Sequence, residues 1–347
     1  MRKKHQGGAI KAWLRLVRRH PCRPPSKPEG SALAGQALDA SRAWLQYASS
    51  GVFCASFVKD AVKWRAWRCT GTPGDGVLVR LDTFYPDEEG RQFGCMSMMP
   101  LLVAVVGALN DVGKMSGCLP NRPKEVRVTF VAHPAKRMLP PAGTPLAADH
   151  VNGGVTFMAD EGVLVYRTED ARKVLVHELL HLYNYDTSLR GNIAVEQTVV
   201  DTFNIQLLPG GPKHLGLSEC YIDAMACFLQ AAWAGRWTRR AHRAALDRHI
   251  SGVAARVAAH SGVFSFPWSP ASRRFREATH AFSYYVCKAA LWGHLEAVVL
   301  GLPTDPPLRD PAAFAACVIA AVRAWRPTGA TRSTASITAS LRMTCVD

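Results

Sequence analysis

Hydrophobic and polar residues alternate along several short segments in the middle of the chain. Glu125–Val131 alternates cleanly, and Gly154–Met158 and Gly162–Tyr166 have the same strand-like composition. A period of two is typical of β-strands, and the Asp160–Gly162 sequence predicts a turn between the last two segments. Another strand is predicted at Val77–Phe84. The pattern therefore predicts a small sheet that ends directly before residue 167.

Longer apolar segments follow, and their spacing is helical. Val174–Tyr183 is predicted to be a buried helix, because its residues are almost all uncharged. Thr168 is its expected N-cap, and Glu169 and Asp170 place negative charge in its first turn. Three further helices are predicted, at Ala224–Ala234, Arg236–His260 and Ala312–Trp325.

The predicted helix Val174–Tyr183 carries the pattern H-E-x-x-H, as His177-Glu178-Leu-Leu-His181. Residues four apart lie on one side of a helix, so both imidazoles can bind one zinc ion. Glu178 adjoins the first ligand and is placed to act as a general base on water. The pattern therefore favours metal-assisted hydrolysis, most often of peptide bonds. The alternative is an amphipathic core helix with two incidental histidines.

A catalytic zinc needs a third protein ligand. The metzincin pattern would require His or Asp at position 187 and Gly at position 184, which are Thr187 and Asn184. Glu219 is the better candidate, with Asp223 on the same helix face to accept a hydrogen bond from a ligand histidine. Glu196 is the alternative ligand, and Glu219 would otherwise be an ordinary acid in a first helical turn.

Two motifs together resemble a known family. His177-Glu-Leu-Leu-His181 followed by His214-Leu-Gly-Leu-Ser-Glu219 is similar to the pattern of the mitochondrial metalloproteases that process a precursor subunit of the ATP synthase. Asn152-Gly-Gly and Phe264-Ser-Phe-Pro267 also resemble that family. The resemblance implies a zinc endopeptidase with His177, His181 and Glu219 as ligands and Glu178 as base.

The chain also departs from that family. The segment between the two motifs is longer here, and Gly191–Gly211 has the character of an insertion. The cysteine-rich N-terminal segment of the family has no clear match. The natural substrate therefore cannot be carried over from the resemblance.

The expected fold is α+β, a gluzincin-like, zincin-like metallopeptidase core in which a small, mostly antiparallel sheet lies over the H-E-x-x-H helix, with an additional helical lobe. We expect a basic, disordered tail over residues 1–40 and a zincin-like domain over residues 41–300, with an N-terminal helical region. Its catalytic core covers about 125–235 and its helical lobe 236–300. Residues 301–347 are expected to be a linker, a short helix and a Ser/Thr-rich tail.

The net charge of the chain is +15. Residues 1–28 contain Lys and Arg but no acid, and Ile10–Arg19 predicts a basic amphipathic helix. A second basic segment runs through residues 236–260. Both segments are candidates for binding a nucleic acid or an anionic membrane surface. The alternatives are a solvated tail and an ordinary exposed helix.

The ten cysteines are dispersed and form no C-x-x-C pair. Their spacing predicts neither a zinc ribbon nor a redox site, and it indicates a reducing, intracellular compartment, mitochondrial or nuclear. The N-terminus lacks a secretory hydrophobic region, so secretion is not expected. Met98–Ala108 is too short to span a membrane and is predicted to be a buried helix.

The leading hypothesis is an enzyme, a zinc-dependent endopeptidase that acts on a protein or peptide substrate with Zn²⁺ as its cofactor. The oxyanion donor stays open among Tyr221, His214 and His280. The competing hypotheses are a nucleic-acid-associated zinc protease and a non-enzymatic binding protein on a degenerate zincin fold.

Overall fold

The computed structural model describes residues 3–23, 29–50, 59–73, 76–116, 123–158, 162–261, 275–295, 310–326 and 340–342. The chain divides into two compact units. The sheet unit contains residues 14–136 and 152–185, and the helical unit contains residues 1–13, 137–151 and 186–346. The protein is a mixed α+β structure, as expected from the sequence.

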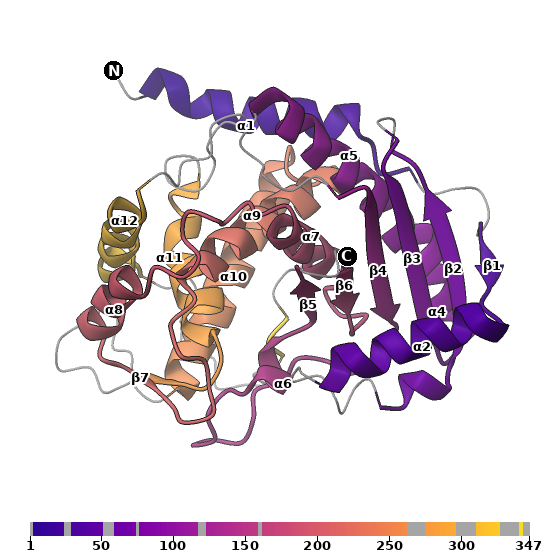
Figure 1. Cartoon of the computed structure of the whole chain (residues 1–347). Coiled ribbons are helices and arrows are strands. Elements are labelled where there is room, and N and C mark those ends of the chain that lie inside the picture. The colour runs from indigo at the N-terminus through magenta and orange to yellow at the C-terminus, as the bar shows by residue number, and fades with distance from the viewer. Residues whose placement is uncertain are drawn as a thin grey trace. The chain divides into compact units, whose positions relative to one another are not determined.

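The sheet unit is built on a six-stranded sheet with the order β1-β2-β3-β4-β6-β5 (Figure 1). Its strands are β1 (Ser31–Ala32), β2 (Arg65–Gly71), β3 (Leu78–Tyr85), β4 (Glu125–Val131), β5 (Gly154–Phe157) and β6 (Gly162–Val165). β3 pairs in parallel with β4, and β4 with β6, whereas the other neighbouring strands are antiparallel. β5 therefore forms one edge of the sheet.

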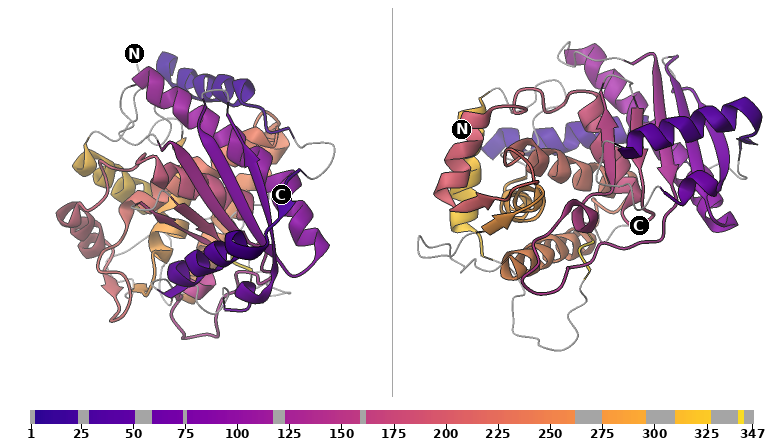
Figure 2. Two further views of the ribbon diagram at one scale, coloured as in Figure 1. Left: turned by 45° about the vertical axis from the view of Figure 1, so that its right-hand side comes forward. Right: turned by 60° about the horizontal axis from the view of Figure 1, so that its bottom comes forward.

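Helices cover both faces of this sheet (Figures 1 and 2). α2 (Gly35–Ser50) packs on the face that carries Phe84 and Leu164, where a cluster of buried apolar side chains forms. α5 (Met99–Ser116) and α7 (Ala171–Leu182) contact the strands of the sheet and one another on the opposite face. Strands that are buried on both faces explain why the predicted segments are rich in Val, Leu and Phe.

The structure confirms the strands predicted before and after residue 160, and the strand at Glu125–Val131. The expectation of a mostly antiparallel sheet holds only in part, because the two central pairings are parallel and the sheet is mixed. The alternation of a strand does not encode the direction of its neighbour. The predicted turn at residues 160–162 lies outside the described residues except for Gly162, which begins β6.

The apolar segment predicted at Met98–Ala108 belongs to a much longer helical stretch. α4 (Glu88–Phe93), the π-helical turn η2 (Gly94–Met98) and α5 follow one another without a break. Over Glu88–Lys114 this stretch has the length and the composition to cross a membrane, so the sequence-based length was too short. However, 67% of its most apolar window is buried within the protein, as in the core helix of a globular fold. The expectation of a buried helix is thus confirmed.

The helical unit contains α9 (Leu217–Trp233), a helix that is buried along most of its length. Its other elements are α6 (Ala148–Val151), α8 (Ile193–Thr202), β7 (Ile205–Leu207), α10 (Arg240–His260), β8 (Phe275–Glu277), η3 (Phe282–Cys287), α11 (Lys288–Trp292) and α12 (Pro311–Ala324). β7 and β8 form a parallel pair. The segment predicted to be an insertion, Gly191–Gly211, therefore contributes α8 and β7.

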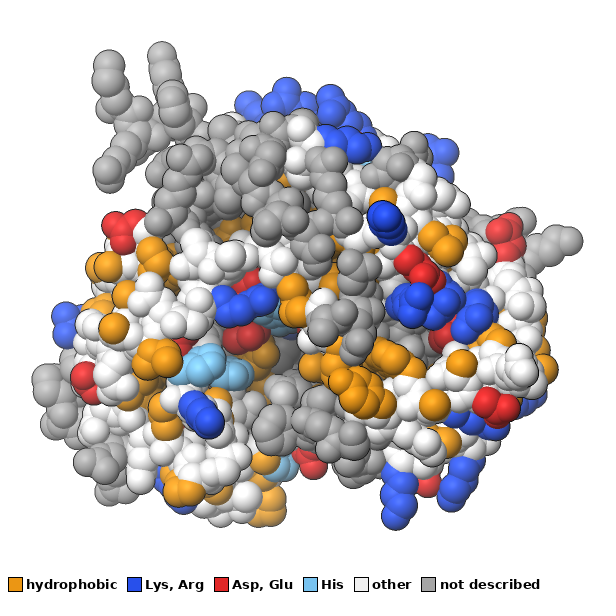
Figure 3. Space-filling model, viewed as in Figure 1, with side chains coloured by type: hydrophobic (Ala, Val, Ile, Leu, Met, Phe, Trp, Pro, Cys, Tyr) orange, Lys and Arg blue, Asp and Glu red, His pale blue; other side chains and the backbone are white. Residues whose placement is uncertain are grey.

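The N-terminal segment was expected to be a disordered basic tail, but most of its described residues form helices and a short strand. α1 (Lys3–Arg19) is a helix, and β1 and α2 follow before residue 51. The amphipathic pattern explains this, since Trp13, Leu16 and Val17 are buried. Lys and Arg side chains gather over α1 at the top of Figure 3. The motif at Phe264–Pro267, most of the predicted linker and the Ser/Thr-rich tail to residue 339 lie outside the described residues.

Candidate functional site

α7 carries the H-E-x-x-H pattern in the interior of the sheet unit. It begins after Asp170, which has a φ of 58°, and its side chains from Val174 to Leu182 are buried. The prediction that Thr168 caps this helix was wrong. The Thr168 hydroxyl donates to the carbonyl of His133 instead, at 3.1 Å. The Ala171 amide bonds to the Thr168 carbonyl at 3.2 Å, so backbone groups close the first turn.

His177 and His181 point at the same place, as their spacing predicted. Their Nε2 atoms are 3.1 Å apart, and the side chains are buried, with exposed fractions of 4% and 9%. Two nitrogen ligands at the usual distance from a tetrahedral zinc lie roughly 3.3–3.4 Å apart. The pair therefore fits a common zinc ion with very little movement. The same distance also suits a hydrogen bond between two neutral imidazoles, so metal content decides between the two.

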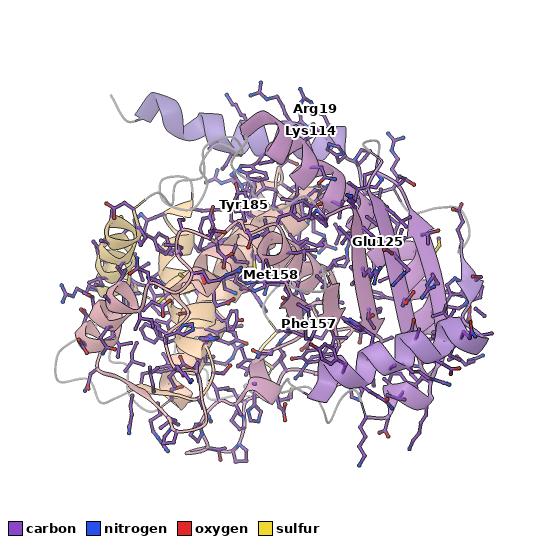
Figure 4. The ribbon with its side chains drawn as sticks, viewed as in Figure 1. Arg19, Lys114, Glu125, Phe157, Met158 and Tyr185 are labelled. Carbon is purple, nitrogen blue, oxygen red and sulfur yellow. The ribbon has the colours of Figure 1, made fainter. Side chains whose placement is uncertain are left out.

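Glu178 is buried beside the edge strand β5. The Thr156 hydroxyl has two acceptors on this residue, Oε2 of the carboxylate at 2.8 Å and the backbone carbonyl at 2.9 Å. Gly154 permits this close packing, since a Cβ there would lie 2.9 Å from Glu178 Cγ and 2.6 Å from a methyl of Val174. Sequence reasoning missed Thr156. The alternation of β5 could have indicated it, because successive residues of a strand point to opposite faces of the sheet. Gly154 and Thr156 face α7, whereas Phe157, labelled in Figure 4, faces the other side.

The remaining predicted site residues lie on α9 in the helical unit. Glu219 is half-buried in the first turn of α9, where its amide donates to the carbonyl of Gly216 at 3.0 Å. Asp223 lies one turn further on and is fully buried. Its Oδ2 accepts a hydrogen bond from the Lys288 ammonium at 2.7 Å. Asp223 thus has a buried structural partner in Lys288, which the sequence did not suggest.

Glu196, the alternative ligand, holds the start of α9. The carboxylate is buried and accepts hydrogen bonds from the amides of Leu217 at 2.8 Å and Gly216 at 3.1 Å. His214 Nδ1 lies 3.1 Å from the same carboxylate. A negative charge at the N-terminus of a helix is stabilised by the free amides and the helix dipole. Both oxygens are therefore engaged in positioning α9 and His214, which argues against Glu196 as a metal ligand.

The three candidate oxyanion donors differ in their surroundings. Tyr221 is fully buried against Phe314, and His280 Nδ1 lies 2.9 Å from the carbonyl of Leu215. His214 has 41% of its side chain exposed, and its Nδ1 faces Glu196. This contact fixes the ring and leaves Nε2 as the atom for a further partner. Of the three, His214 is the best placed to contact a substrate.

We expect Glu196→Ala to lower the free energy of unfolding of the helical unit by about 2–4 kcal/mol, because two buried amides lose a charged acceptor. Chemical denaturation followed by circular dichroism measures this loss. Gln197→Ala is the matched control, since Gln197 is exposed and bonds only to Asp201 among the contacts seen in the described residues. Its effect should stay within about 0.5 kcal/mol. Equal stability of the two variants would contradict the role of Glu196.

The basic segment at residues 236–260 forms α10 and the turn before it, which confirms the predicted helix. One side of α10 borders a cavity of about 900 Å³ within the helical unit. Besides Asp247 and several alanines, its lining includes three tryptophans and three arginines: Trp237, Arg240, Arg243, Trp292, Trp325 and Arg326. The Arg243 guanidinium lies 5.8 Å from the ring centre of Trp237, within the range of a cation–π contact.

Comparison of the chain with protein-family models, curated proteins and solved structures finds no match. The resemblance carried by the two motifs is therefore an expectation, and the functional assignment depends on the residues described above.

Proposed function

We propose that this protein is a zinc-dependent endopeptidase with a zincin-like, gluzincin-type core. The observation that carries the proposal is that the Nε2 atoms of His177 and His181 lie 3.1 Å apart. Glu178, the residue after the first of them, is also buried. A pair of incidental core histidines would not need a carboxylate in the adjacent position. The resemblance to the mitochondrial processing metalloproteases of the ATP synthase precursor supports the same class.

His177, His181 and Glu219 are the proposed ligands. Together they offer two imidazole nitrogens and one carboxylate oxygen, a set that can hold a metal ion and that catalytic zinc sites commonly use. When bound there, zinc would polarise the scissile carbonyl and lower the pKa of a water molecule. Asp223 is then a positioning residue for α9 through its ion pair with Lys288.

Glu178 is the proposed general base. Its carboxylate accepts the proton of the water that attacks the scissile carbonyl, and it returns that proton to the leaving amine. The Thr156 hydroxyl, 2.8 Å from Oε2, is the proposed donor that orients this carboxylate. His214, fixed by Glu196, is the proposed donor to the developing oxyanion. The protein side of the reaction therefore uses a base, a base-positioning hydroxyl and an oriented imidazole.

The edge strand β5 supports a peptide as the substrate. β5 ends the strand order of the sheet, and Thr156 of this strand contacts Glu178. An extended peptide can add to a strand edge through backbone hydrogen bonds, which brings its carbonyls past the adjacent side chains. Backbone recognition of this kind suits an endopeptidase, because it requires no chain end.

Removal of the metal tests the proposal. Dialysis against 1,10-phenanthroline should lower cleavage of a quenched-fluorescent peptide library by roughly 1,000-fold, and added Zn²⁺ should restore it. The non-chelating isomer 1,7-phenanthroline is the control and should have no effect. Cleavage that persists in protein shown to be free of metal would contradict a zinc peptidase.

A nucleic-acid-associated protease is the second candidate, favoured by the tryptophan- and arginine-lined cavity beside α10. Surfaces that combine aromatic rings with arginines bind single strands by stacking and charge. A labelled single-stranded oligonucleotide should therefore bind, and Arg240→Glu with Arg243→Glu should weaken binding at least about tenfold. Arg248→Glu, on the same helix but outside the cavity lining, is the matched control. Equal affinity of both variants would reject this role.

A further inference from the structure

Two cysteines of the sheet unit meet although they are distant in sequence. Cys69 is on β2, Cys95 is in η2, and their sulfur atoms are 3.3 Å apart. Both side chains are buried, with exposed fractions of 3% and 2%. Gly94 permits the approach, since a Cβ at that position would lie 2.3 Å from the Thr83 hydroxyl oxygen on β3. No disulfide joins the cysteines in the described part of the chain, so the pair is a dithiol.

The two thiols are not equivalent. The Cys69 thiol has two acceptors within reach, the carbonyl of Glu29 at 2.9 Å and the Cys95 sulfur at 3.3 Å. Its contact with Cys95 lowers the pKa of Cys95, and the positive charge of Arg91 lowers that pKa further. The same contact, together with burial, raises the pKa of Cys69. Arg91 is held near Cys95 by an ion pair with Glu88 and by stacking over the Trp67 ring at 4.5 Å. Cys95 is therefore the thiol that ionises first.

A small cavity is lined by both cysteines. Its volume is about 280 Å³, and its lining includes Cys69 and Cys95 with Arg23, Glu29, Met99 and Val103. A molecule of the size of hydrogen peroxide fits this space, whereas a protein reductant does not. Access through a cavity explains how two thiols that are almost fully buried could still meet a small oxidant.

We propose that Cys69 and Cys95 form a redox-reactive dithiol that hydrogen peroxide or another small hydroperoxide oxidises to a disulfide. The Cys95 thiolate attacks one peroxide oxygen: an S–O bond forms, the O–O bond breaks, and the leaving hydroxide takes a proton to become water. The Cys69 sulfur then attacks the Cys95 sulfur, which releases hydroxide that takes the Cys69 proton. The two sulfurs lose two electrons, and hydrogen peroxide becomes two waters, whereas an organic hydroperoxide would become one water and one alcohol.

The geometry supports closure of the bond. The sulfur atoms need to approach by about 1.3 Å to reach the length of a disulfide. Cys95 lies in a single π-helical turn, which is a local irregularity in the continuous helix Glu88–Lys114 and can adjust more readily than regular helix. η2 and α5 both pack against α7, so the bond would tie β2 to the elements that support the H-E-x-x-H helix.

Peptide mapping tests the proposal on the full chain. The protein is treated with a small molar excess of hydrogen peroxide, the remaining thiols are blocked with N-ethylmaleimide, and non-reduced peptides are analysed by mass spectrometry. We expect a Cys69–Cys95 cross-link that dithiothreitol removes. Cys317→Ser, which deletes an exposed thiol, is the matched control and should leave the cross-link unchanged. Recovery of Cys69 and Cys95 as blocked thiols after peroxide treatment would overturn the proposal.

A second measurement assigns the attacking thiol without depending on the disulfide. In Cys69→Ser, peroxide should leave Cys95 as a sulfenic acid that dimedone labels, because no neighbouring thiol can resolve it. In Cys95→Ser, Cys69 should label at least about tenfold less. Labelling of Cys69 in preference to Cys95 would contradict the order of steps.

Discussion

Replacement of Glu178 by glutamine should reduce peptide hydrolysis by roughly 10²- to 10⁴-fold while zinc content stays unchanged. Glutamine has almost the same volume and can still accept the hydrogen bond from Thr156, but it cannot take a proton from water. The loss should appear in kcat, with little change in KM, because the proton transfer belongs to the chemical step. Steady-state cleavage of a fluorogenic peptide, beside metal analysis of the same preparation, measures both quantities.

Glu169→Gln is the matched control for this experiment. Glu169 is an acid of the same unit, just before α7, and the proposed chemistry does not use it. It should hydrolyse the peptide at the rate of the parent protein. If Glu178→Gln cleaves as fast as Glu169→Gln, Glu178 is not the base. A non-enzymatic protein on a degenerate zincin fold would then be favoured.

Glu219→Ala should weaken zinc binding at least about 100-fold, because a site with two imidazoles lacks one of its three protein ligands. Competition with a chelating dye measures the affinity directly. Glu196→Gln is the informative comparison, since Glu196 was the alternative ligand and the structure engages both its oxygens at the start of α9. It should retain zinc and lose conformational stability.

The opposite result would change which residue is assigned as the third ligand. Zinc that is retained by Glu219→Ala and lost from Glu196→Gln would identify Glu196 as the ligand and contradict its role at the helix start. Zinc that is lost from both variants would show that the start of α9 must be held in place for Glu219 to bind. Denaturation curves of the two variants separate that case from simple unfolding.

Local patterns in the sequence were sufficient for part of this structure. The four-residue spacing of His177 and His181 predicted their convergence, since the geometry of one helix alone determines it. The strands β4, β5 and β6 were predicted because alternation, or a short run of β-branched and apolar residues, is a property of a single segment. In both cases no information about a distant partner was needed.

The rest depended on partners that are remote in sequence. Lys288 lies 65 residues from Asp223, and nothing near either residue indicates their ion pair. The role of Glu196 became visible only when α8 placed its carboxylate at the amides before α9. The absence of a C-x-x-C motif argued against a redox site, whereas Cys69 and Cys95 are brought together by the packing of η2 on the sheet. Parallel strand pairing was missed for the same reason.

The most direct test of the central claim is the zinc content of the purified protein, measured by elemental mass spectrometry beside the double variant His177→Ala, His181→Ala. We predict close to one zinc ion per chain in the parent protein and none in the variant, with both still folded by circular dichroism. Folded parent protein that holds no zinc after purification in its presence would contradict the claim. His177 and His181 would then be a hydrogen-bonded pair in an ordinary core helix.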